Sequence, residues 1–529
     1  MRSQLFGFGV MLVVGLGLNG CASGRTEMTA PMIIPQPAEM QLGEEFFRIR
    51  PNTVILADDA GDIANHPAAY LAMFLRKGTG FSLPVNPKAI VSRGNVIRLT
   101  SEGADAALGD EGYELIIERG AAMIRAPKPA GLFYGVQTLR QLLPAQAERP
   151  EPAARSDWSV PCLKIRDYPR FRWRGMLLDV SRHFFNMDVL KQTIDLLSLH
   201  KLNVLHLHLS DDQGWRVEIA RYPELTRVAS SGSYSDPNAG GGYLRKGDVR
   251  ELVAYAAERH IRIVPEIEMP GHAGAATKAY PEFSGGAGTF NPAKEETYVF
   301  LEGILTEIME MFPSPYIHFG GDEVNRSGWE NLPEVKERMK AEGLSNTHQL
   351  EGYFAKRIAA FIRSKGRTPM GWDEIEAAGV GSGAVIHWWR PDGTDLRDRA
   401  LRSGRGVVLS PTTRCYFDYR QSRSEKGFGD QVLALDTVYA WEPVEGLSRD
   451  EAADVLGVQA NVWTEVIPNR ERLQYMMFPR LCALAEVAWT PPARKDPAQF
   501  HKRLDAMLER LRNLGINFRD PHQDPGQPK

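Results

Sequence analysis

This 529-residue sequence has a small net charge, few cysteines and few long apolar runs. The 63 basic and 66 acidic residues give a formal net charge of −3 at pH 7, which leaves no electrostatic case for nucleic acid as a partner. Only 4 cysteines are present. Apart from Cys21 they are Cys162, Cys415 and Cys482, which are too few and too scattered to define a disulfide framework or a zinc site. We expect these three to be buried thiols, with at most one pair bridged.

The one long apolar run lies near the amino end. Arg2 precedes an apolar segment from Leu5 to Leu18, which is short for a membrane span. The segment ends in Leu18-Asn19-Gly20-Cys21, which resembles the lipobox of bacterial lipoproteins. The resemblance implies a signal peptide (1–21), cleavage before Cys21, lipidation of its sulfur and a tether (22–30). We therefore expect an exported, periplasmic or cell-envelope lipoprotein that contacts the membrane only through this anchor. A plain secretory signal is the alternative, and it also implies export.

After the tether, short strand patterns alternate with two helix patterns. Apolar residues such as Phe133, Val136 and Leu139 fall on one face of the second helix, so this helix is expected to pack against a sheet. Residues 31–150 are interpreted as a small α+β domain that ends in the Pro- and Ala-rich segment 144–154. The expected strands are Thr53–Leu56, Val96–Thr100, Tyr113–Glu118 and Ala122–Ala126, and the expected helices are Ala68–Arg76 and Gly131–Leu143.

From Tyr168 onward the pattern changes to apolar strands with polar ends, and amphipathic helices follow most of them. Eight such strands predict a (β/α)8 TIM barrel for residues 165–515, since barrels of this class contain from ~200 to more than ~400 residues. A doubly wound sheet is the alternative, but no Gly-rich phosphate turn follows the first strand. Residues 516–529 are expected to form a flexible tail. The expected strands are Gly175–Val180, Val204–Leu209, Arg262–Ile267, Tyr316–Phe319, Thr368–Gly371, Ala384–Trp388, Gly406–Ser410 and Leu456–Ala460.

Acids and tryptophans follow strand after strand. The chemistry of a TIM barrel lies at the carboxyl ends of its strands. Carboxylates that accept from hydroxyls, beside flat rings that cover C–H faces, are the side chains with which proteins bind sugars. The residues in these positions include Asp179, Arg182, Asp211, Asp212, Glu266, Glu268, His272, Asp322, Glu323, Trp372, Asp373, Glu374, Trp389, Tyr416, Asp418, Trp463 and Glu465, with Arg174 at the beginning of the first strand.

The segment HFGGDE, residues 318–323, places two acids directly after a short apolar strand. Hydrolysis of an acetal needs a proton for the leaving oxygen and stabilisation of an oxocarbenium-like centre. Burial beside another carboxylate raises the pKa of an acid, so one of Asp322 and Glu323 is expected to be charged and the other protonated. Adjacent residues are poorly placed to flank one bond from both sides, which indicates a division of labour different from the usual carboxylate pair.

Seven segments of the barrel, in chain order, resemble the β-N-acetylhexosaminidases of glycoside hydrolase family 20. They are RGMLLDVSRHFF (174–185), HLHLSDDQGWR (206–216), EIEMPGH (266–272), HFGGDE (318–323), GWDE (371–374), YFD (416–418) and VWTE (462–465). FYGVQTL (133–139) resembles the amino-terminal domain of the family. The resemblance implies an exo-acting, retaining enzyme that removes terminal non-reducing N-acetylglucosamine or N-acetylgalactosamine from oligosaccharides, with no cofactor and no metal. The 2-acetamido oxygen of the substrate is the nucleophile, and an oxazolinium ion is the intermediate.

The same resemblance implies a role for each residue of the site. Glu323 is the general acid and then the base, Asp322 orients the acetamido nitrogen, and Tyr416 donates to the acetamido oxygen with Asp418 nearby. Trp372, Trp389 and Trp463 form the walls around the sugar. Arg174 and Glu465 hold its hydroxyls at the closed end. His272 and either Asp211 or Asp212 tune Glu323, and the sequence leaves the choice between the two aspartates open.

Two alternatives from other classes of protein remain. His206 and His208 fall on one face of a strand. With nearby acids they imitate the ligand pair of a metal-dependent TIM-barrel hydrolase. A sugar-binding lipoprotein without activity is the other alternative, and it conflicts with the presence of Glu323. Turnover of a chromogenic N-acetylglucosaminide that resists a chelator separates the three.

Overall fold

The computed structural model describes residues 30–58, 66–86, 95–152 and 157–523. The expected signal peptide, Cys21 and nearly all of the expected tether lie outside these ranges. From Pro31 onward the chain forms one compact unit. Within the described ranges, no helix has the length and apolar character needed to cross a membrane.

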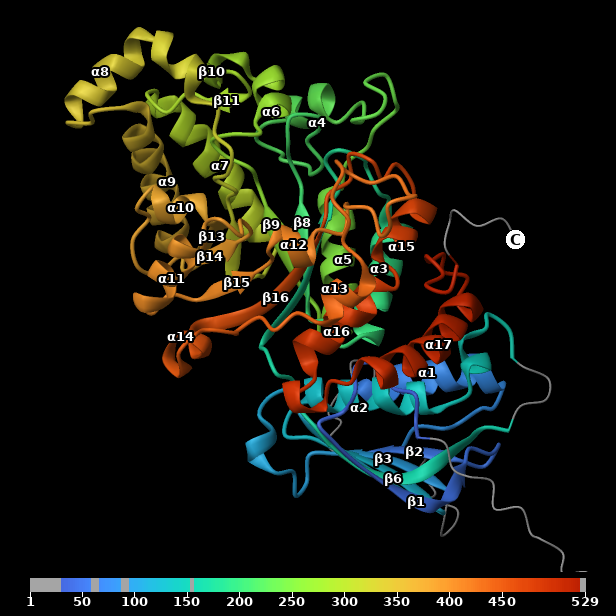
Figure 1. Cartoon of the computed structure of the whole chain (residues 1–529). Coiled ribbons are helices and arrows are strands. Elements are labelled where there is room, and N and C mark those ends of the chain that lie inside the picture. The colour runs from blue at the N-terminus through green and yellow to red at the C-terminus, as the bar shows by residue number, and fades with distance from the viewer. Residues whose placement is uncertain (1–29, 59–65, 87–94, 153–156, 524–529) are drawn as a thin grey trace, which may run out of the picture. The chain divides into compact units, whose positions relative to one another are not determined.

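The amino-terminal domain is a six-stranded sheet in the order β1-β6-β4-β5-β3-β2. Helices α1 (Pro67–Thr79) and α2 (Pro129–Leu142) lie together along the sheet (Figure 1). Their apolar faces and the sheet share one buried core, as the helix pattern predicted. The strands are β1 (Glu39–Arg48), β2 (Val54–Ala57), β3 (Val96–Thr100), β4 (Tyr113–Glu118), β5 (Ala121–Arg125) and β6 (Ser159–Asp167).

The boundary of this domain lies later in the chain than the sequence suggested. β6 pairs antiparallel with both β1 and β4, so the sheet continues to Asp167 rather than ending near residue 150. Neither β1 nor β6 was among the expected strands. Pro161 interrupts the strand pattern of β6, because proline cannot donate to a strand ladder. β1 contains Gly43 and an irregularity in register between Leu42 and Phe46.

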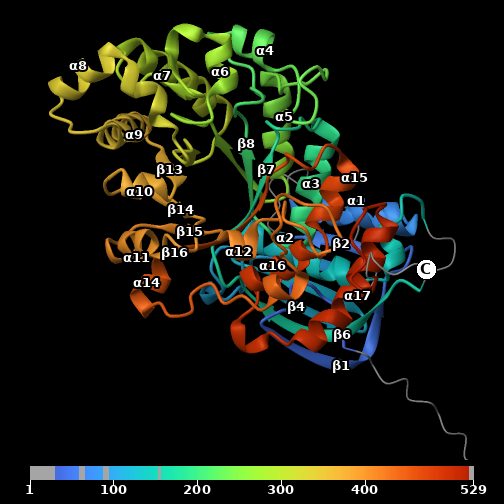
Figure 2. The ribbon, with the colours of Figure 1, turned by 45° about the horizontal axis from the view of Figure 1, so that its top comes forward.

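The predicted barrel is confirmed. Eight parallel strands close in the order β12-β13-β14-β15-β16-β7-β8-β9, with helices outside them (Figure 2). Each coincides with one of the eight expected strands, with ends that differ by one or two residues. They are β7 (Trp173–Asp179), β8 (Val204–His208), β9 (Arg262–Glu266), β12 (Tyr316–His318), β13 (Thr368–Trp372), β14 (Val385–Trp388), β15 (Val407–Leu409) and β16 (Val455–Val462); β10 (Ser284–Gly286) and β11 (Thr289–Phe290) form a separate hairpin.

Several helices begin where a capping side chain accepts a backbone N–H group. Asn186 and Asn346 do so at the first turns of α3 and α9. The helices of this part of the chain are α3 (Met187–Leu199), α4 (Glu224–Ala229), α5 (Lys246–Ala257), α6 (Gly274–Ala279), α7 (Glu295–Met311), α8 (Pro333–Ala341), α9 (Thr347–Ser364), α10 (Glu374–Ala377), α11 (Thr394–Arg402), α12 (Thr412–Cys415), α13 (Leu435–Tyr439), α14 (Arg449–Asp454), α15 (Arg470–Met477), α16 (Arg480–Trp489) and α17 (Pro497–Asn513). Cys162, Cys415 and Cys482 are buried and free, in agreement with expectation.

The carboxyl end is more ordered than a flexible tail from residue 516. Helix α17 packs against the amino-terminal domain, where Arg510 pairs with Glu148. Beyond it, Ile516 is buried, and Arg519 forms an ion pair with Glu425 at 2.5 Å. The expected tail therefore holds packed residues at least to Arg519, while residues 524–529 lie outside the described ranges.

Candidate active site

A cavity of about 290 Å³ opens at the carboxyl end of the barrel. Residues in or after all eight strands line it. They include every residue to which the family resemblance gave a role, except Arg174 and Asp212. Tyr419 and Phe428 were missed because they lie in an irregular segment without a recognisable pattern. The lining residues are Arg182, His208, Asp211, His272, Asp322, Glu323, Trp372, Trp389, Tyr416, Asp418, Tyr419, Phe428, Trp463 and Glu465.

The turn after β12 is built on two glycines. Gly320 and Gly321 have φ angles of 69° and 96°, which favour glycine. A Cβ on Gly320 would lie 1.7 Å from Oε1 of Glu268, and the Gly321 N–H donates to the same oxygen at 2.9 Å. Glu323 is also left-handed, at φ 48°, a strained conformation for a residue with a side chain. The turn places Asp322 inside the cavity, with a side chain 14% exposed, and Glu323 at the rim, with a side chain 60% exposed.

His272 links these two acids to Asp211. Its Nε2 lies 3.6 Å from Oε2 of Glu323 and 3.8 Å from Oδ2 of Asp322. Its Nδ1 lies 3.3 Å from Oδ1 of Asp211. Asp212 lies outside the cavity, where its Oδ1 accepts a backbone N–H at the beginning of α6 at 2.9 Å. Of the two aspartates, Asp211 is therefore the one that faces both His272 and the cavity.

The pKa values of the two acids shift in opposite directions. Burial raises the pKa of Asp322, with His272 opposing it and Glu266 and Glu323 adding to it. The neighbouring His272 lowers the pKa of Glu323 despite the partial burial of this carboxyl. Burial by itself would lower the pKa of His272, but Asp211 and its other acidic neighbours raise it above its ordinary value. The sequence predicted one protonated and one charged acid without saying which. In the structure the raised pKa is that of Asp322, because Glu323 lies at the rim beside a cation.

Three tryptophans and a tyrosine form one aromatic cluster around the cavity. The ring centroids of Trp372 and Trp463 lie 5.7 Å apart, and Trp389 is stacked with Tyr416 at 6.1 Å. Tyr416 in turn lies 6.5 Å from Trp463. The Trp372 indole is held in place because its N–H donates to Glu266 at 2.9 Å. The cluster presents flat apolar faces to any molecule in the cavity.

Three carboxylate oxygens of the cavity are buried without a hydrogen-bond partner in the described part of the chain. They belong to Asp322 (Oδ1), Asp418 (Oδ1) and Glu465 (Oε2). Burial is the main cause of the raised pKa of Asp418 and of Glu465. An unsatisfied buried acceptor costs about 1–3 kcal/mol. A ligand that supplies hydroxyl or amide donors to these oxygens recovers that free energy.

Arg174 is not in the cavity, so the substrate contact expected for it is wrong. It lies at the amino end of β7, where its fully buried guanidinium pairs with both oxygens of Glu111 at 2.8 and 2.9 Å. The arginine that faces the cavity is Arg182, which follows the same strand. Its Nη2 lies 2.8 Å from Oδ2 of Asp211, and its guanidinium lies 5.1 Å from the Trp463 ring centroid. The position of the two arginines in the sequence distinguishes them, because a residue at the beginning of a barrel strand lies at the end of the barrel opposite to the catalytic site.

The suggested metal ligands His206 and His208 both lie against the buried carboxylate of Glu266. The Glu266 carboxylate lies 2.5 Å from Nδ1 of His208, 2.7 Å from Nδ1 of His318 and 3.3 Å from Nε2 of His206. Ligand atoms around one tetrahedral cation are separated by about 3.3 Å. Two of these contacts are shorter than that, and the one with His208 is a hydrogen bond. As placed, Glu266 therefore lies too close to His208 and His318 for one cation to sit between them.

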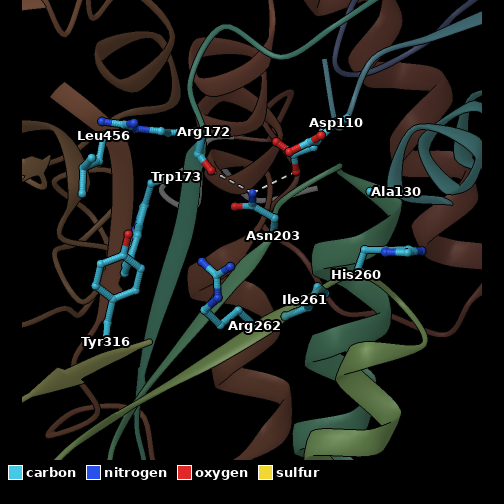
Figure 3. Close-up of a pocket in the computed structure, with 11 residues that line it drawn as sticks. Asp110, Ala130, Arg172, Trp173, Asn203, His260, Ile261, Arg262, Tyr316 and Leu456 are labelled. Carbon is cyan, nitrogen blue, oxygen red and sulfur yellow. Dashed lines mark hydrogen bonds between the residues drawn. The ribbon is translucent and has the colours of Figure 1, made fainter. Parts of the chain in front are cut away.

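A second cavity, of about 500 Å³, lies at the amino end of the barrel (Figure 3). Asn203 joins the two domains there, donating to Oε1 of Glu111 at 3.0 Å and to the Arg172 carbonyl at 2.9 Å. Tyr316 packs edge-on against Trp173. Of the described residues that line this cavity, none has a buried side-chain polar atom without a partner. It thus lacks the free acceptors that distinguish the first cavity.

Hydrolysis of a glycosidic bond is the chemistry that this fold and this site support together, which places the chain among the barrel glycoside hydrolases. Residues 171–492 match the catalytic domain of glycosyl hydrolase family 20, and residues 30–168 match domain 2 of that family. The chain therefore belongs to glycosyl hydrolase family 20, as its motifs indicated. The domain 2 match also extends past residue 150, in agreement with the position of β6.

Relatives and solved structures support the same assignment. A β-hexosaminidase of Porphyromonas gingivalis is 35% identical over 98% of this chain and 69% of its own length. The family 20 β-N-acetylhexosaminidase of Streptomyces coelicolor A3(2) matches with a TM-score of 0.83 and 35% identity, over 94% of this chain and 98% of that one. The exo β-N-acetylglucosaminidase of Vibrio harveyi matches with a TM-score of 0.85 and 30% identity, over 93% and 79%. The family is exo-acting and uses substrate-assisted catalysis, so the chain is a glycoside hydrolase of the β-hexosaminidase type.

Proposed function

We propose that the cavity binds the terminal non-reducing N-acetylhexosamine of an oligosaccharide and that Asp322 and Glu323 divide the catalysis. The observation that carries this is the set of unpartnered oxygens of Asp322, Asp418 and Glu465 within aromatic walls. A sugar offers the hydroxyl and amide donors that these oxygens lack. At about 290 Å³ the cavity is small for a ligand site, which suits one sugar residue and hence cleavage from the chain end.

In the first step the acetamido oxygen attacks the anomeric carbon while Glu323 gives a proton to the leaving oxygen. The Asp322 carboxylate accepts the acetamido N–H and stabilises the positive charge of the oxazolinium ion. Burial keeps the pKa of Tyr416 well above its usual range, so its hydroxyl remains a donor for the acetamido oxygen. Glu323 then takes a proton from the water that opens the oxazolinium, which gives net retention.

Substrate binding is expected to let Glu323 take up, from solvent, the proton that it needs as the general acid. A sugar over the rim covers the Glu323 carboxyl, and this desolvation raises its pKa toward that of a general acid. The acetamido N–H acts in the opposite sense on Asp322, because a hydrogen bond to the carboxylate favours the charged form. The two pKa values are therefore expected to exchange order when the cavity is filled.

Arg182, Asp418 and Glu465 form the closed end of the cavity and are assigned to the hydroxyls of the sugar. The Nη2 of Arg182 lies 3.9 Å from Oε1 of Glu465, so a hydroxyl can accept from the arginine while it donates to the glutamate. This arrangement replaces the one expected for Arg174 and Glu465.

The test is a comparison of matched chromogenic substrates. The N-acetylglucosaminide should be cleaved at least about 10³-fold faster than the glucoside that lacks the acetamido group. A thiazoline analogue of the cyclised intermediate should inhibit strongly, and a chelator should have no effect. Equal cleavage of the two glycosides, or indifference to the thiazoline, would contradict the assignment.

Export with a lipid anchor at Cys21 is the second part of the proposal. It is supported by the apolar segment 5–18 and the lipobox-like residues 18–21. Expression of the full chain in a bacterium should give a membrane-bound, acylated form, and Cys21→Ala should release the protein in soluble form. Unmodified Cys21 in the mature protein would argue for a plain secretory signal.

A further inference from the structure

A line of acids and imidazoles, joined by hydrogen bonds as far as Asp211 and by ion-pair contacts beyond it, connects the barrel axis to Glu323. It runs from Glu266 through His208, Asp211 and His272. Oε2 of Glu266 lies 2.5 Å from Nδ1 of His208, whose Nε2 lies 2.8 Å from Oδ2 of Asp211. Oδ1 of Asp211 lies 3.3 Å from Nδ1 of His272, whose Nε2 lies 3.6 Å from Glu323. Acids and imidazoles alternate along its whole length.

His208 joins two carboxylates, so it is an imidazolium. Each of its ring nitrogens faces one of them, and only the doubly protonated ring can donate from both positions. Burial by itself would lower the pKa of His208, but Glu266 and Asp211 outweigh this effect and raise the pKa to about 10. The ring also packs edge-on against Trp463, with centroids 4.9 Å apart. His208 is thus a fixed buried cation beneath the catalytic cavity.

His208 also determines which oxygen of Asp211 faces His272. Oδ2 is occupied by two cations, Nε2 of His208 and Nη2 of Arg182, each at 2.8 Å. The backbone N–H of residue 212 donates to Oδ1 at 2.6 Å. These contacts fix the carboxylate plane and leave Oδ1 directed at His272. Without His208, one of the two anchors of Oδ2 is lost.

The inner end of the line is anchored in the barrel sheet itself. Glu266 is in register with His208 on β8 and with His318 on β12. Its Oε1 lies 2.7 Å from Nδ1 of His318 and accepts from the Trp372 indole at 2.9 Å. All four side chains are buried. Because strands are more rigid than loops, this end gives the line a fixed origin.

We propose that Glu266 and His208 are positioning residues for the general acid and act on it through Asp211 and His272. The inference rests on the proposed role of Glu323. The charged groups that face His272 are Asp211, Asp212, Asp322 and Glu323, so loss of orientation at Asp211 lets His272 follow its other acidic neighbours. The Glu323 carboxyl then no longer sits where the leaving oxygen is protonated.

The test uses His208→Gln and two N-acetylglucosaminides that differ only in the leaving group. An alkyl or sugar leaving group needs a proton, whereas 2,4-dinitrophenolate departs without one. The variant should lose about 10- to 100-fold in kcat/KM with the poor leaving group and about threefold or less with dinitrophenolate. Glu266→Gln, which keeps the shape but removes the charge, should give the same split if His208→Gln does not fold. Equal losses with both substrates, or no loss, would overturn the proposal.

His200→Gln is the matched control for loss of a buried histidine. The His200 ring contacts the Leu196 carbonyl and Sγ of Cys482, neither of which belongs to the line. It should change kcat/KM for both substrates by the same small factor. Failure of the proposed function gives a different result, because wild-type protein would then cleave neither substrate. If the wild-type protein is active and both variants show its leaving-group dependence, the positioning role is contradicted but the proposed function is not.

Discussion

His272 and Glu323 meet at the mouth of the barrel with backbones that are both left-handed. Their φ angles are 45° and 48°, and Nε2 of one lies 3.6 Å from Oε2 of the other. Each such conformation in a residue with a side chain costs on the order of 1 kcal/mol or more. They come from the ends of different strands, β9 and β12, so their contact depends on how the barrel sets the two turns. The strain is therefore located at the carboxyl to which the proton transfer is assigned.

Replacement of Glu323 by Gln should remove turnover of substrates with poor leaving groups. Loss of a general acid reduces the rate by about 10²–10⁴-fold, and the side chain is 60% exposed, so the fold should remain intact. The measurements are kcat/KM with an alkyl glycoside and the thermal unfolding temperature. Glu330→Gln changes an exposed glutamate in the same region and should be silent in both. Full activity of the Glu323 variant would rule out the acid assignment.

Replacement of Asp322 by Asn should impair participation of the acetamido group. The amide cannot stabilise the positive charge of the oxazolinium, so kcat should fall even with good leaving groups. Added azide should give little rescue, since the nucleophile belongs to the substrate and is still present. Strong rescue, with a glycosyl azide as product, would indicate instead that an enzymic nucleophile had been removed.

Arg174 in β7 and Arg182 after this strand should give opposite phenotypes. Arg182→Gln removes a charged donor beside Asp211 and Glu465, and kcat/KM should fall about 30- to 1,000-fold. Arg174→Gln breaks a buried ion pair with Glu111 and should lower the free energy of unfolding by about 3–5 kcal/mol, with kcat/KM nearly unchanged. Urea unfolding and steady-state kinetics on both variants make the comparison. A loss of activity in Arg174→Gln at unchanged stability would contradict a purely structural role for Arg174.

Glu374 should make the protein less stable as the pH rises. Burial, with Asp322 and Asp373 adding, raises its pKa to about 9, whereas the unfolded chain has an ordinary glutamate. Below about pH 4.5 this side chain is protonated in the folded and the unfolded state alike, so the free energy of unfolding is not lowered by it. Between about pH 4.5 and about pH 9 the free energy of unfolding falls by up to about 1.4 kcal/mol per pH unit. Glu374→Gln should flatten this part of the curve of unfolding free energy against pH. An unchanged slope would show that another group controls it.

Much of the barrel could be predicted because the patterns that mark its strands and helices are formed by residues close together in the sequence. Each strand is a short apolar run with a polar end, and each amphipathic helix repeats its apolar residues with its own period, so chain order was enough to assign eight units. The adjacent acids at 322 and 323 and the tryptophans at strand ends are likewise features of neighbouring residues. β6 was not predicted because Pro161 interrupts its strand pattern. Only its pairing with β1 and β4, which are distant in the sequence, identifies it as a strand.

The sequence by itself determined the barrel, the cavity's chemical character and the residues from which its acids come. Only the tertiary structure decided that Arg182 rather than Arg174 faces the cavity and that Asp211 rather than Asp212 contacts it. It also decided that the pKa of Asp322 is raised and that of Glu323 lowered. The physical reason is that a side chain's direction, burial and charged neighbours are set by strands far apart in the chain, which no local pattern records.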